Sequence, residues 1–201
     1  MKRFLDVLLS LLAIIFLSPL MLVICLIIIC DDGMPVIFRQ DRVGRGDKLF
    51  KIKKFRTMKN GAPNLSTADF EESDEYITRS GKFLRRTSLD ELPQLFNVLA
   101  GDMSFIGPRP TLTYHPWRFE EYSDTQRRRF EVRPGITGLA QVHGRKTIDW
   151  NDRIKYDVEY VDKLSLGLDC KILFQTVWNV LTMKDNNNVG KTSEPKENKD
   201  A

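Results

Sequence analysis

The hydrophobic pattern of this 201-residue chain is dominated by one apolar run, residues 7–30, that contains no charged side chain. As a helix rising 1.5 Å per residue the run would extend about 36 Å, which exceeds the roughly 30 Å of a bilayer's hydrocarbon core. Ser18 and Pro19 lie in its middle. Because Pro19 has no backbone N–H, the pattern predicts a bend or break there, and the Ser18 hydroxyl can bind the carbonyl left free.

Charges on both sides of the run bear on its topology. Lys2 and Arg3 precede it, and a dense series of arginines and lysines follows it between residues 39 and 59. Since positive residues near a membrane segment tend to stay on the cytoplasmic side, a re-entrant hairpin that turns at Ser18 and Pro19 satisfies both flanks. An ordinary kinked spanning helix is the alternative. A cleaved signal peptide is disfavoured because the run is too long and no small-residue cleavage site follows it.

The rest of the chain alternates between helical and short extended patterns. Phenylalanines and lysines between residues 31 and 59, divided by a turn at residues 44–47, predict a β-hairpin. Leucines at three- and four-residue intervals predict an amphipathic helix after Gly81 that ends at Gly101, and further helices are predicted over residues 117–130, 149–164 and 169–183. Residues 107–110 and 133–138 are expected to be loops. The predicted fold class is therefore mostly α with a small β-hairpin.

Composition divides the chain into three parts. We predict a re-entrant membrane hairpin over residues 1–30, one compact domain with its own core over residues 31–184 and a disordered polar tail over residues 185–201. The net charge of +4 is modest, but its basic residues cluster at 39–59 and at 127–129. Such clusters suit anionic lipid headgroups or phosphorylated substrates, although a solvated surface is the simpler interpretation. Cys25, Cys30 and Cys170 form no disulfide framework, which favours a reducing cytoplasmic setting.

Two adjacent carboxylates, Asp90 and Glu91, are the candidate chemistry of the chain. Ser88 and Glu91 match a capping box, in which serine and glutamate side chains bind the first amides of a helix, and this structural role is the competing interpretation. Pro93 disturbs that register, because it would cost a backbone hydrogen bond inside the helix.

Arginines surround this pair in the sequence. Arg85 and Arg86 precede it, Arg109 lies in a loop between two prolines, and Arg133 and Arg145 flank a glycine-containing stretch. Guanidinium groups bind phosphate oxygens bidentately, and a carboxylate can hold Mg²⁺ or attack phosphorus. On a membrane-bound chain, the combination indicates phosphoryl chemistry on a lipid.

Several long motifs resemble those of the bacterial sugar transferases, the monotopic phosphoglycosyl transferases. The central ones are Ser88-Leu89-Asp90-Glu91-Leu92-Pro93-Gln94-Leu95, Asn97-Val98-Leu99, Gly101-Asp102-Met103-Ser104 and Gly107-Pro108-Arg109-Pro110. Others are Lys2-Arg3 with Asp6, Ser18-Pro19, Phe38-Arg39-Gln40 with Arg42 and Gly44, Lys54-Phe55-Arg56-Thr57-Met58, and Arg133-Pro134-Gly135-Ile136-Thr137-Gly138-Leu139-Ala140-Gln141-Val142 with Gly144-Arg145. The resemblance extends to about residue 183.

The resemblance implies transfer of a sugar 1-phosphate from a UDP-sugar to undecaprenyl phosphate, with release of UMP and with Mg²⁺ as cofactor. Asp90 would be the nucleophile that forms a covalent phosphosugar intermediate and would also hold the metal. Glu91 would assist, by activating the lipid phosphate or by positioning metal and acid. Arg85, Arg109 and Arg145 are the implied phosphate-binding residues.

The resemblance also implies the re-entrant hairpin, with its break at Ser18 and Pro19, and amphipathic helices at the cytoplasmic face of a bacterial inner membrane. It further implies the minimal form of the family, which starts assembly of a capsule, O-antigen or glycoprotein glycan on membrane lipid without involving nucleic acid. The alternative function is a non-catalytic, membrane-anchored basic protein that binds anionic lipid or nucleic acid. That alternative gives no reason for Asp90 and Glu91, and the sequence does not identify the sugar.

Overall fold

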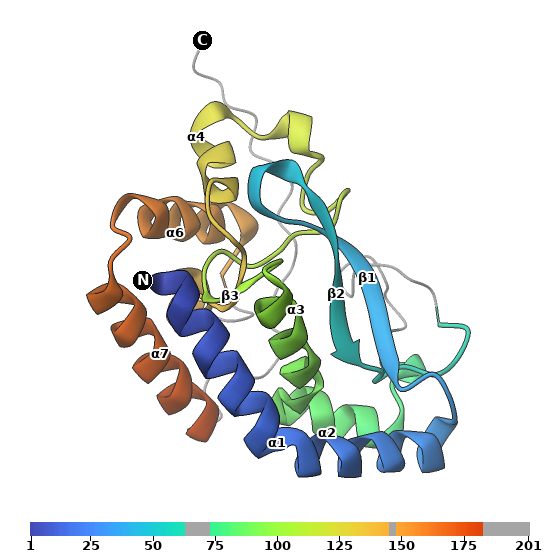
Figure 1. Ribbon diagram of the computed structural model, residues 1–201. Helices are drawn as coiled ribbons and strands as arrows, with labels where there is room; N and C mark the ends of the chain where they lie inside the picture. The colour runs from blue at the N-terminus through green and yellow to red at the C-terminus, as the bar shows by residue number, and fades with distance from the viewer. Residues whose placement is uncertain (63–72, 145–147, 183–201) are drawn as a thin grey trace.

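A computed structural model describes residues 1–62, 73–144 and 148–182 of the chain. The described part is mostly helical, with two small two-stranded sheets and one long apolar helix at the N-terminus (Figure 1). The mostly helical fold and the small hairpin predicted from sequence are therefore confirmed. The division into three parts stays a prediction, and the tail over residues 185–201 lies outside the described residues.

The elements follow one another in a fixed order along the chain. The α-helices are α1 (Lys2–Asp32), α2 (Arg79–Thr87), α3 (Leu95–Ala100), α4 (Asp124–Arg127), α5 (Leu139–Gly144), α6 (Trp150–Asp162) and α7 (Leu166–Leu181). The strands are β1 (Ile37–Val43), β2 (Leu49–Phe55), β3 (Ser104–Ile106) and β4 (Gly135–Thr137). The 3₁₀ turns are η1 (Arg45–Asp47), η2 (Ser73–Tyr76), η3 (Leu89–Gln94), η4 (Phe119–Glu121) and η5 (Arg128–Phe130).

Helix α1 is the one described helix long and apolar enough to cross a membrane, judged by length and composition. It stays helical through Pro19, and its axis turns part-way along its length (Figure 1). The missing N–H of Pro19 would leave the carbonyl of Ile15 without its helical donor. The Ser18 hydroxyl donates to that carbonyl at 2.8 Å, which is the compensation that the sequence predicted.

Polar side chains fix the N-terminal end of α1 to the rest of the protein. The Lys2 ammonium lies 2.7 Å from the Asp169 carboxylate of α7 and donates to the Ile106 carbonyl at 3.0 Å. Arg3 donates to the carbonyls of Val98 and Leu99, at 2.6 and 3.0 Å, and so caps the C-terminal end of α3. These contacts place the start of the apolar helix against elements that lie about a hundred or more residues later in the chain.

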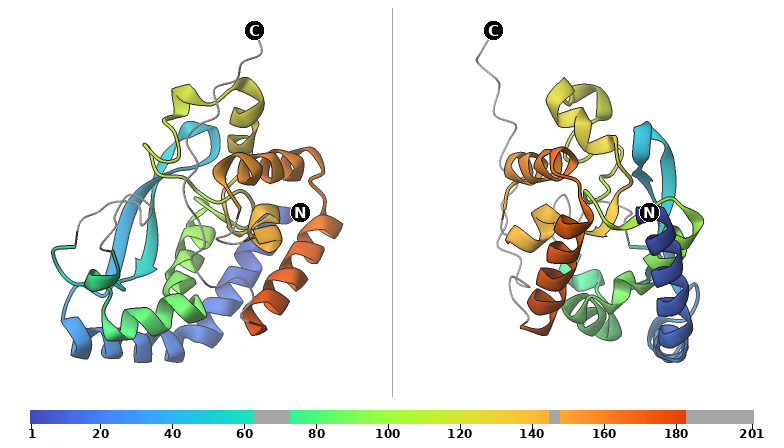
Figure 2. Two further views of the ribbon diagram at one scale, coloured as in Figure 1. Left: turned by 180° about the vertical axis from the view of Figure 1, so that it is seen from behind. Right: turned by 60° about the vertical axis from the view of Figure 1, so that its left-hand side comes forward.

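The C-terminal end of α1 is held by the same body. The Arg56 guanidinium donates to the carbonyls of Asp32 and Gly33, at 2.9 and 2.7 Å, where a positive charge also suits the helix dipole. Ile24 and Ile28 pack against the buried side chains of Phe55 in β2 and Leu84 in α2. The second half of α1 and α2 consequently run together along the base of the molecule (Figures 1 and 2).

Strands β1 and β2 form the predicted antiparallel hairpin, which pairs Ile37 with Phe55 and Val43 with Leu49. The turn at residues 44–47 connects them through η1, in which Gly46 has a φ of 61°. A positive φ strains most side chains but not glycine, so this residue permits the turn. The hairpin extends from the base of the molecule, and its turn end lies near α4 (Figure 1).

The prediction of a single helix after Gly81 is wrong, because three separate elements, α2, η3 and α3, occupy this segment. Ser88 between the first two has a φ of 59° and makes no capping hydrogen bond through its side chain, so the predicted capping box does not form. The 3₁₀ turn η3 contains Pro93, and α3 begins at Leu95. The physical reason is that proline cannot donate the hydrogen bond that a continuous α-helix needs at its position.

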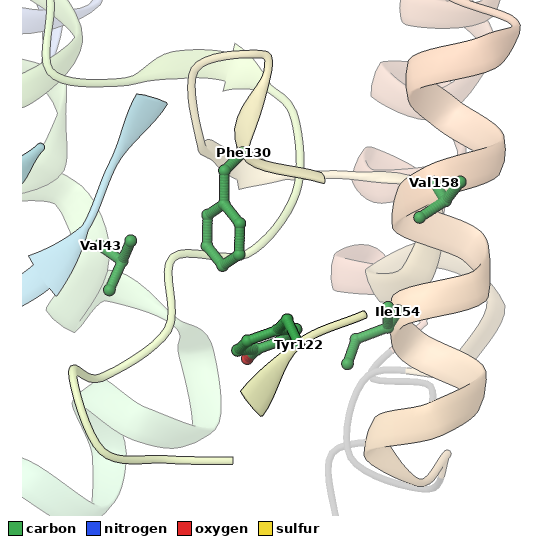
Figure 3. Close-up of a cluster of buried hydrophobic side chains, with 5 residues drawn as sticks. All are labelled: Val43, Tyr122, Phe130, Ile154 and Val158. Carbon is green, nitrogen blue, oxygen red and sulfur yellow. The ribbon is translucent and has the colours of Figure 1, made fainter. Parts of the chain in front are cut away.

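The helix predicted over residues 117–130 is also wrong, since η4, α4 and η5 replace it. Tyr122 adopts an extended conformation and Ser123 then caps a new helix. The extended residue buries the Tyr122 ring beside Phe130 of η5 and Ile154 of α6 (Figure 3). Tertiary packing of aromatic rings therefore overrides the local helical pattern. The predicted helices over residues 149–164 and 169–183 correspond to α6 and α7.

The loops at residues 107–110 and 133–138 meet each other, and part of the second is strand β4, which pairs in parallel with β3. A Cβ atom on Gly135 would lie 2.1 Å from the backbone nitrogen of Gly107. Only glycine permits this approach of the two backbones. The glycines of both motifs thus serve to bring distant segments together.

Large apolar side chains remain exposed on several helices. On α1 they include Phe4, Leu8, Leu12, Ile15, Phe16, Leu22 and Val23, and on α7 they include Leu173, Phe174, Val177, Trp178 and Leu181. Phe83 of α2 is also half-exposed. Apolar surface on this scale is typical of a protein that contacts a membrane or a partner.

We predict that Asp6→Ala destabilises the protein by about 1–3 kcal/mol. The buried Asp6 carboxylate accepts hydrogen bonds from the Ser104 hydroxyl at 3.0 Å and the Phe105 amide at 3.1 Å, and alanine would leave both donors unpaired. Thermal unfolding in detergent measures the change. Asp6→Asn keeps an acceptor oxygen and should unfold closer to the wild type, whereas equal unfolding of Asp6→Ala and wild type would contradict the anchoring role.

Candidate active site

The two adjacent carboxylates lie on η3, which packs against strand β2. Asn97 of α3 is fully buried and joins these elements, because its side-chain oxygen accepts from the Lys53 amide at 3.0 Å and its amide group donates to the Lys51 carbonyl at 2.8 Å. This two-way hydrogen bond fixes the helical segment to the backbone of β2. Asp90 and Glu91 are thereby held beside the end of the strand that carries Lys54.

Basic side chains contact both carboxylates. The Lys54 ammonium lies 2.6 Å from Oε1 of Glu91 and 3.9 Å from Oδ2 of Asp90. The Arg109 guanidinium approaches the same Glu91 oxygen at 3.7 Å. The structure therefore brings together Asp90, Glu91 and Arg109, which the sequence singled out, and adds Lys54.

Burial raises the pKa of the Asp90 carboxyl above its ordinary value, because water is largely excluded from it. The Lys54 ammonium opposes this rise, the neighbouring Glu91 carboxylate adds to it, and the charges of Arg85 and Arg109 oppose it. Only 13% of the Asp90 side chain is exposed. The site thus holds a desolvated carboxyl inside a ring of cations, an environment that is frequent at catalytic centres.

The structure places two of the three predicted phosphate-binding arginines near the dyad. Arg85 lies on α2, where its Nε donates to the Thr57 hydroxyl at 2.8 Å, and its charge acts on Asp90. Arg109 lies in the proline loop and reaches Glu91. Arg145 lies outside the described residues, so its predicted role stays a prediction.

Lys54 and Arg42 belong to the site but were not predicted as site residues. Lys54 lies in a strand whose alternation of apolar and basic residues is equally typical of a solvated hairpin. Arg42 is partly buried near Arg109. Both lie within the motifs that resemble those of the sugar transferases, and that resemblance is the sequence signal that could have pointed to them.

Hydrogen bonds hold three consecutive carbonyl groups of the proline loop, residues 107–110. The carbonyl of Pro108 accepts from the Gly135 amide at 2.9 Å, that of Arg109 from the Arg129 guanidinium at 2.9 Å, and that of Pro110 from Arg42 at 3.2 Å. Prolines restrict φ on both sides of Arg109. The backbone that carries the Arg109 guanidinium is consequently rigid.

The carboxylates fit a metal ion that is shared with a substrate. The described residues contain no group of three histidine, cysteine or acidic side chains able to hold a metal. Mg²⁺, however, is commonly bound through one or two carboxylates together with substrate phosphates. Because Glu91 is closely paired with Lys54, Asp90 is the carboxylate better placed to ligate such an ion.

A comparison with known protein families identifies the family of this chain. The family model of the bacterial sugar transferases matches residues 1–183. The chain belongs to the bacterial sugar transferases. This assignment confirms the resemblance that the motifs around Asp90, Arg109 and the other site residues indicated.

Three relatives within this sugar transferase family illustrate its range. A UDP-glucose:undecaprenyl-phosphate glucose-1-phosphate transferase of Caulobacter vibrioides is 42% identical over 190 residues, covering 90% of this chain and 70% of the relative. A UDP-N-acetylgalactosamine-undecaprenyl-phosphate N-acetylgalactosaminephosphotransferase of Aeromonas hydrophila is 41% identical over 184 residues, covering 90% and 44%. The galactosyl transferase CpsE of Streptococcus agalactiae is 40% identical over 192 residues, covering 90% and 42%. The chain thus spans less than half the length of the last two relatives.

We predict that Asp90→Asn raises the thermal stability of this sugar transferase at neutral pH. Because the pKa of Asp90 is raised in the folded state, its contribution to stability is complete below its unfolded pKa and is lost as the pH rises through its folded pKa. Asparagine does not ionise and avoids that loss. Each kcal/mol gained should raise the unfolding midpoint by about 2–4 °C.

The pH dependence is the decisive measurement. Unfolding scans should show the gain of Asp90→Asn over wild type at neutral pH and its disappearance below about pH 4. Asp41→Asn is a matched control, because it removes a carboxylate that is 53% exposed and far from this dyad in the sequence. A gain that is independent of pH would rule out desolvation of Asp90 as its cause.

Proposed function

We propose that this chain transfers a sugar 1-phosphate from a UDP-sugar to undecaprenyl phosphate and releases UMP. The observation that carries the proposal is the desolvated Asp90 carboxyl beside Glu91, within a set of cations that includes Lys54, Arg85 and Arg109. Membership of the sugar transferases and the activities for which the relatives are named support it. A non-catalytic basic anchor would need the cations but not the buried carboxyl.

The reaction takes place in two displacements at one phosphorus atom. An Asp90 oxygen attacks the β-phosphorus of the UDP-sugar, forms an acyl phosphate, and breaks the bond to the bridging oxygen, so that UMP leaves with that electron pair. An oxygen of undecaprenyl phosphate then attacks the same phosphorus and expels the Asp90 carboxylate. The product is a polyprenyl diphosphate sugar, and the enzyme returns to its starting state.

The surrounding charges support each displacement. Lys54 and Arg109 lie close to the dyad and would stabilise negative charge that develops on the transferred phosphoryl group. Glu91 would assist the attack of the lipid phosphate. Mg²⁺, held by Asp90 and substrate phosphates, would supply further neutralisation of the diphosphate.

The way in which α1 is held supports a re-entrant topology. Lys2 and Arg3 at its start and Asp32 and Gly33 at its end all contact the same folded body. A helix that crossed the bilayer would put its ends on opposite faces, so these contacts support a hairpin that enters and leaves on one face. The exposed apolar side chains of α1, α2 and α7 would then contact lipid. Because UDP-sugars are soluble cytoplasmic substrates, that face would be the cytoplasmic face of the bacterial inner membrane.

The relatives do not identify the sugar, because their names refer to different sugars. One names glucose, another N-acetylgalactosamine, and a third is a galactosyl transferase. Transfer of a phosphoryl group is the step that these reactions would share, and the charges around Asp90 and Glu91 bear on that step. The proposal therefore covers UDP-sugars as a class and the first membrane step of glycoconjugate assembly.

We predict that wild-type protein incubated with its UDP-sugar, without lipid phosphate, releases about one equivalent of UMP and then stops. Asp90→Asn should release none, and its steady-state turnover should fall by about 10³-fold or more, because the nucleophile is gone. Mass spectrometry of the intact wild-type protein should show the added phosphosugar. Glu91→Gln should keep the initial UMP release and lose turnover with lipid.

Asp41→Asn serves as the control for charge removal, and circular dichroism establishes that each variant is folded. Retention of full turnover by folded Asp90→Asn would exclude the covalent route. Release of UMP only when lipid phosphate is present would instead indicate direct transfer between the two substrates.

A labelling experiment addresses the topology. In a variant without Cys25, Cys30 and Cys170, we expect a cysteine in a short N-terminal extension and a cysteine replacing Lys163 to react from the same side of inverted membrane vesicles. Lys163 is suitable because 67% of its side chain is exposed on the soluble body. Reaction of the two cysteines from opposite sides would overturn the hairpin.

A further inference from the structure

Two arginines outside the predicted site hold the backbone of the loop that carries Arg109. Arg129 donates to the carbonyl of Arg109 and Arg42 donates to the carbonyl of Pro110, at 2.9 and 3.2 Å. They approach from different elements, since Arg42 lies on β1 and Arg129 on η5. The charges around Arg129 and Arg42 differ, and we infer different functions for the two arginines from this difference.

Arg129 is neutralised by an acid. Its guanidinium lies 2.6 Å from the Asp157 carboxylate of α6, and each side chain is only 1% exposed. A closely paired, buried charge of this kind has no access to a ligand and little net field. Arg129 is therefore a positioning residue for the loop.

Arg42 has no such partner among the ion pairs of the described residues. Its guanidinium instead donates to the neutral side chain of Gln40 at 2.6 Å and to the Pro110 carbonyl. Burial and, to a smaller extent, the positive charge of Arg109 lower the pKa of Arg42 to about 10, against weaker opposing effects of Tyr114 and Glu91. The hydrogen bond from Arg42 to the Pro110 carbonyl places its guanidinium beside the residue that follows Arg109, and the two positive charges disfavour each other.

The nearby negative charge, the Glu91 carboxylate, is paired mainly with Lys54. Glu91 lies 3.7 Å from Arg109 but only 2.6 Å from the Lys54 ammonium. Positive charge around Arg42 and Arg109 consequently exceeds the negative charge that these contacts supply. A multivalent anion bound between the two guanidinium groups would offset this excess and could accept bidentate hydrogen bonds from each.

We propose that Arg42, together with Arg109, binds the diphosphate of the nucleotide substrate. The inference rests on the proposed function, because the dyad defines where the β-phosphorus must lie. It assigns to Arg42 a direct contact with substrate, in contrast to the positioning contact of Arg129.

The position of Arg42 in the fold favours the nucleotide over the lipid phosphate. Arg42 precedes Val43 at the turn end of the hairpin, and Val43 packs with Phe130 and Ile154 in a core cluster to which α1 contributes no side chain (Figure 3). Arg85, by contrast, follows Leu84, which packs against Ile24 and Ile28 of the apolar helix. Arg42 is therefore placed to bind the phosphates of the cytoplasmic nucleotide, and Arg85 is placed to bind the phosphate of the membrane lipid.

Calorimetric titration of the full chain with UDP alone, at constant magnesium and without lipid, tests this assignment. We expect Arg42→Gln to weaken UDP binding about ten-fold or more, because a charge-assisted contact is lost, and to leave uridine binding unchanged. Arg39→Gln removes the same charge from the exposed opposite face of β1 and should bind UDP like the wild type. In steady-state assays, the KM for UDP-sugar should rise in Arg42→Gln while the KM for undecaprenyl phosphate stays the same.

Thermal unfolding controls for loss of structure, and Arg42→Lys provides a second variant that keeps a charge but loses the planar fork. It should bind UDP with an affinity between those of Arg42→Gln and wild type. UDP binding by folded Arg42→Gln at wild-type affinity would overturn the assignment while leaving the proposed transfer reaction intact. Should Arg42→Gln not fold, wild-type affinity of Arg42→Lys would overturn it equally. Absence of UDP binding by the wild type would instead reject the proposed function and this inference together.

Discussion

The attachment of both ends of the apolar helix to one folded body is the constraint on which the rest of this structure depends. At its start, the Lys2 ammonium binds Asp169 and the Tyr160 hydroxyl, at 2.7 and 2.6 Å. Burial and the neighbouring Asp169 raise the pKa of Tyr160, so that this phenol stays a neutral hydrogen-bonding partner. Removing one member of such a cluster would leave a poorly solvated charge without its partner, which is costly. Polar contacts thus determine where a largely apolar segment can lie.

The position of the dyad follows from this attachment. The second half of α1 packs on α2 and β2, and η3 lies between α2 and α3 along the chain while packing against β2. Asn97 then fixes α3 to the β2 backbone, beside Lys54. Under the proposed topology, the same contacts that keep α1 at the membrane surface hold Asp90 within reach of a lipid phosphate. Membrane attachment and catalytic geometry therefore share one set of interactions.

The sequence predicts local features well and non-local ones poorly. The apolar run, its disturbance at Pro19 and the alternating hairpin follow from short-range patterns, and the structure contains each of them. The helix around Asp90 was predicted incorrectly, because leucine spacing persists through Pro93 although the hydrogen bonding does not. Pairing of β3 with β4 depends on the approach of Gly107 and Gly135, which are distant in sequence. Lys54 and Arg42 could not be assigned to the site from local patterns, because their contacts with Glu91 and Pro110 form only when η3 and the proline loop pack against the hairpin.

Two electrostatic costs are built into the site. Asp90 is desolvated, which disfavours its anion, and Arg42 and Arg109 repel each other. The described protein relieves these costs only in part. Lys54, Arg85 and Arg109 favour the Asp90 anion against its desolvation, while Glu91, which offsets some of the positive charge near Arg42, forms the closest ion pair of the site with Lys54. An incoming diphosphate would relieve the repulsion between the arginines and bring its electrophilic phosphorus toward the carboxylate. The repulsion between Arg42 and Arg109 would therefore favour binding of the proposed substrate. The bound diphosphate would in turn place its phosphoryl group toward Asp90.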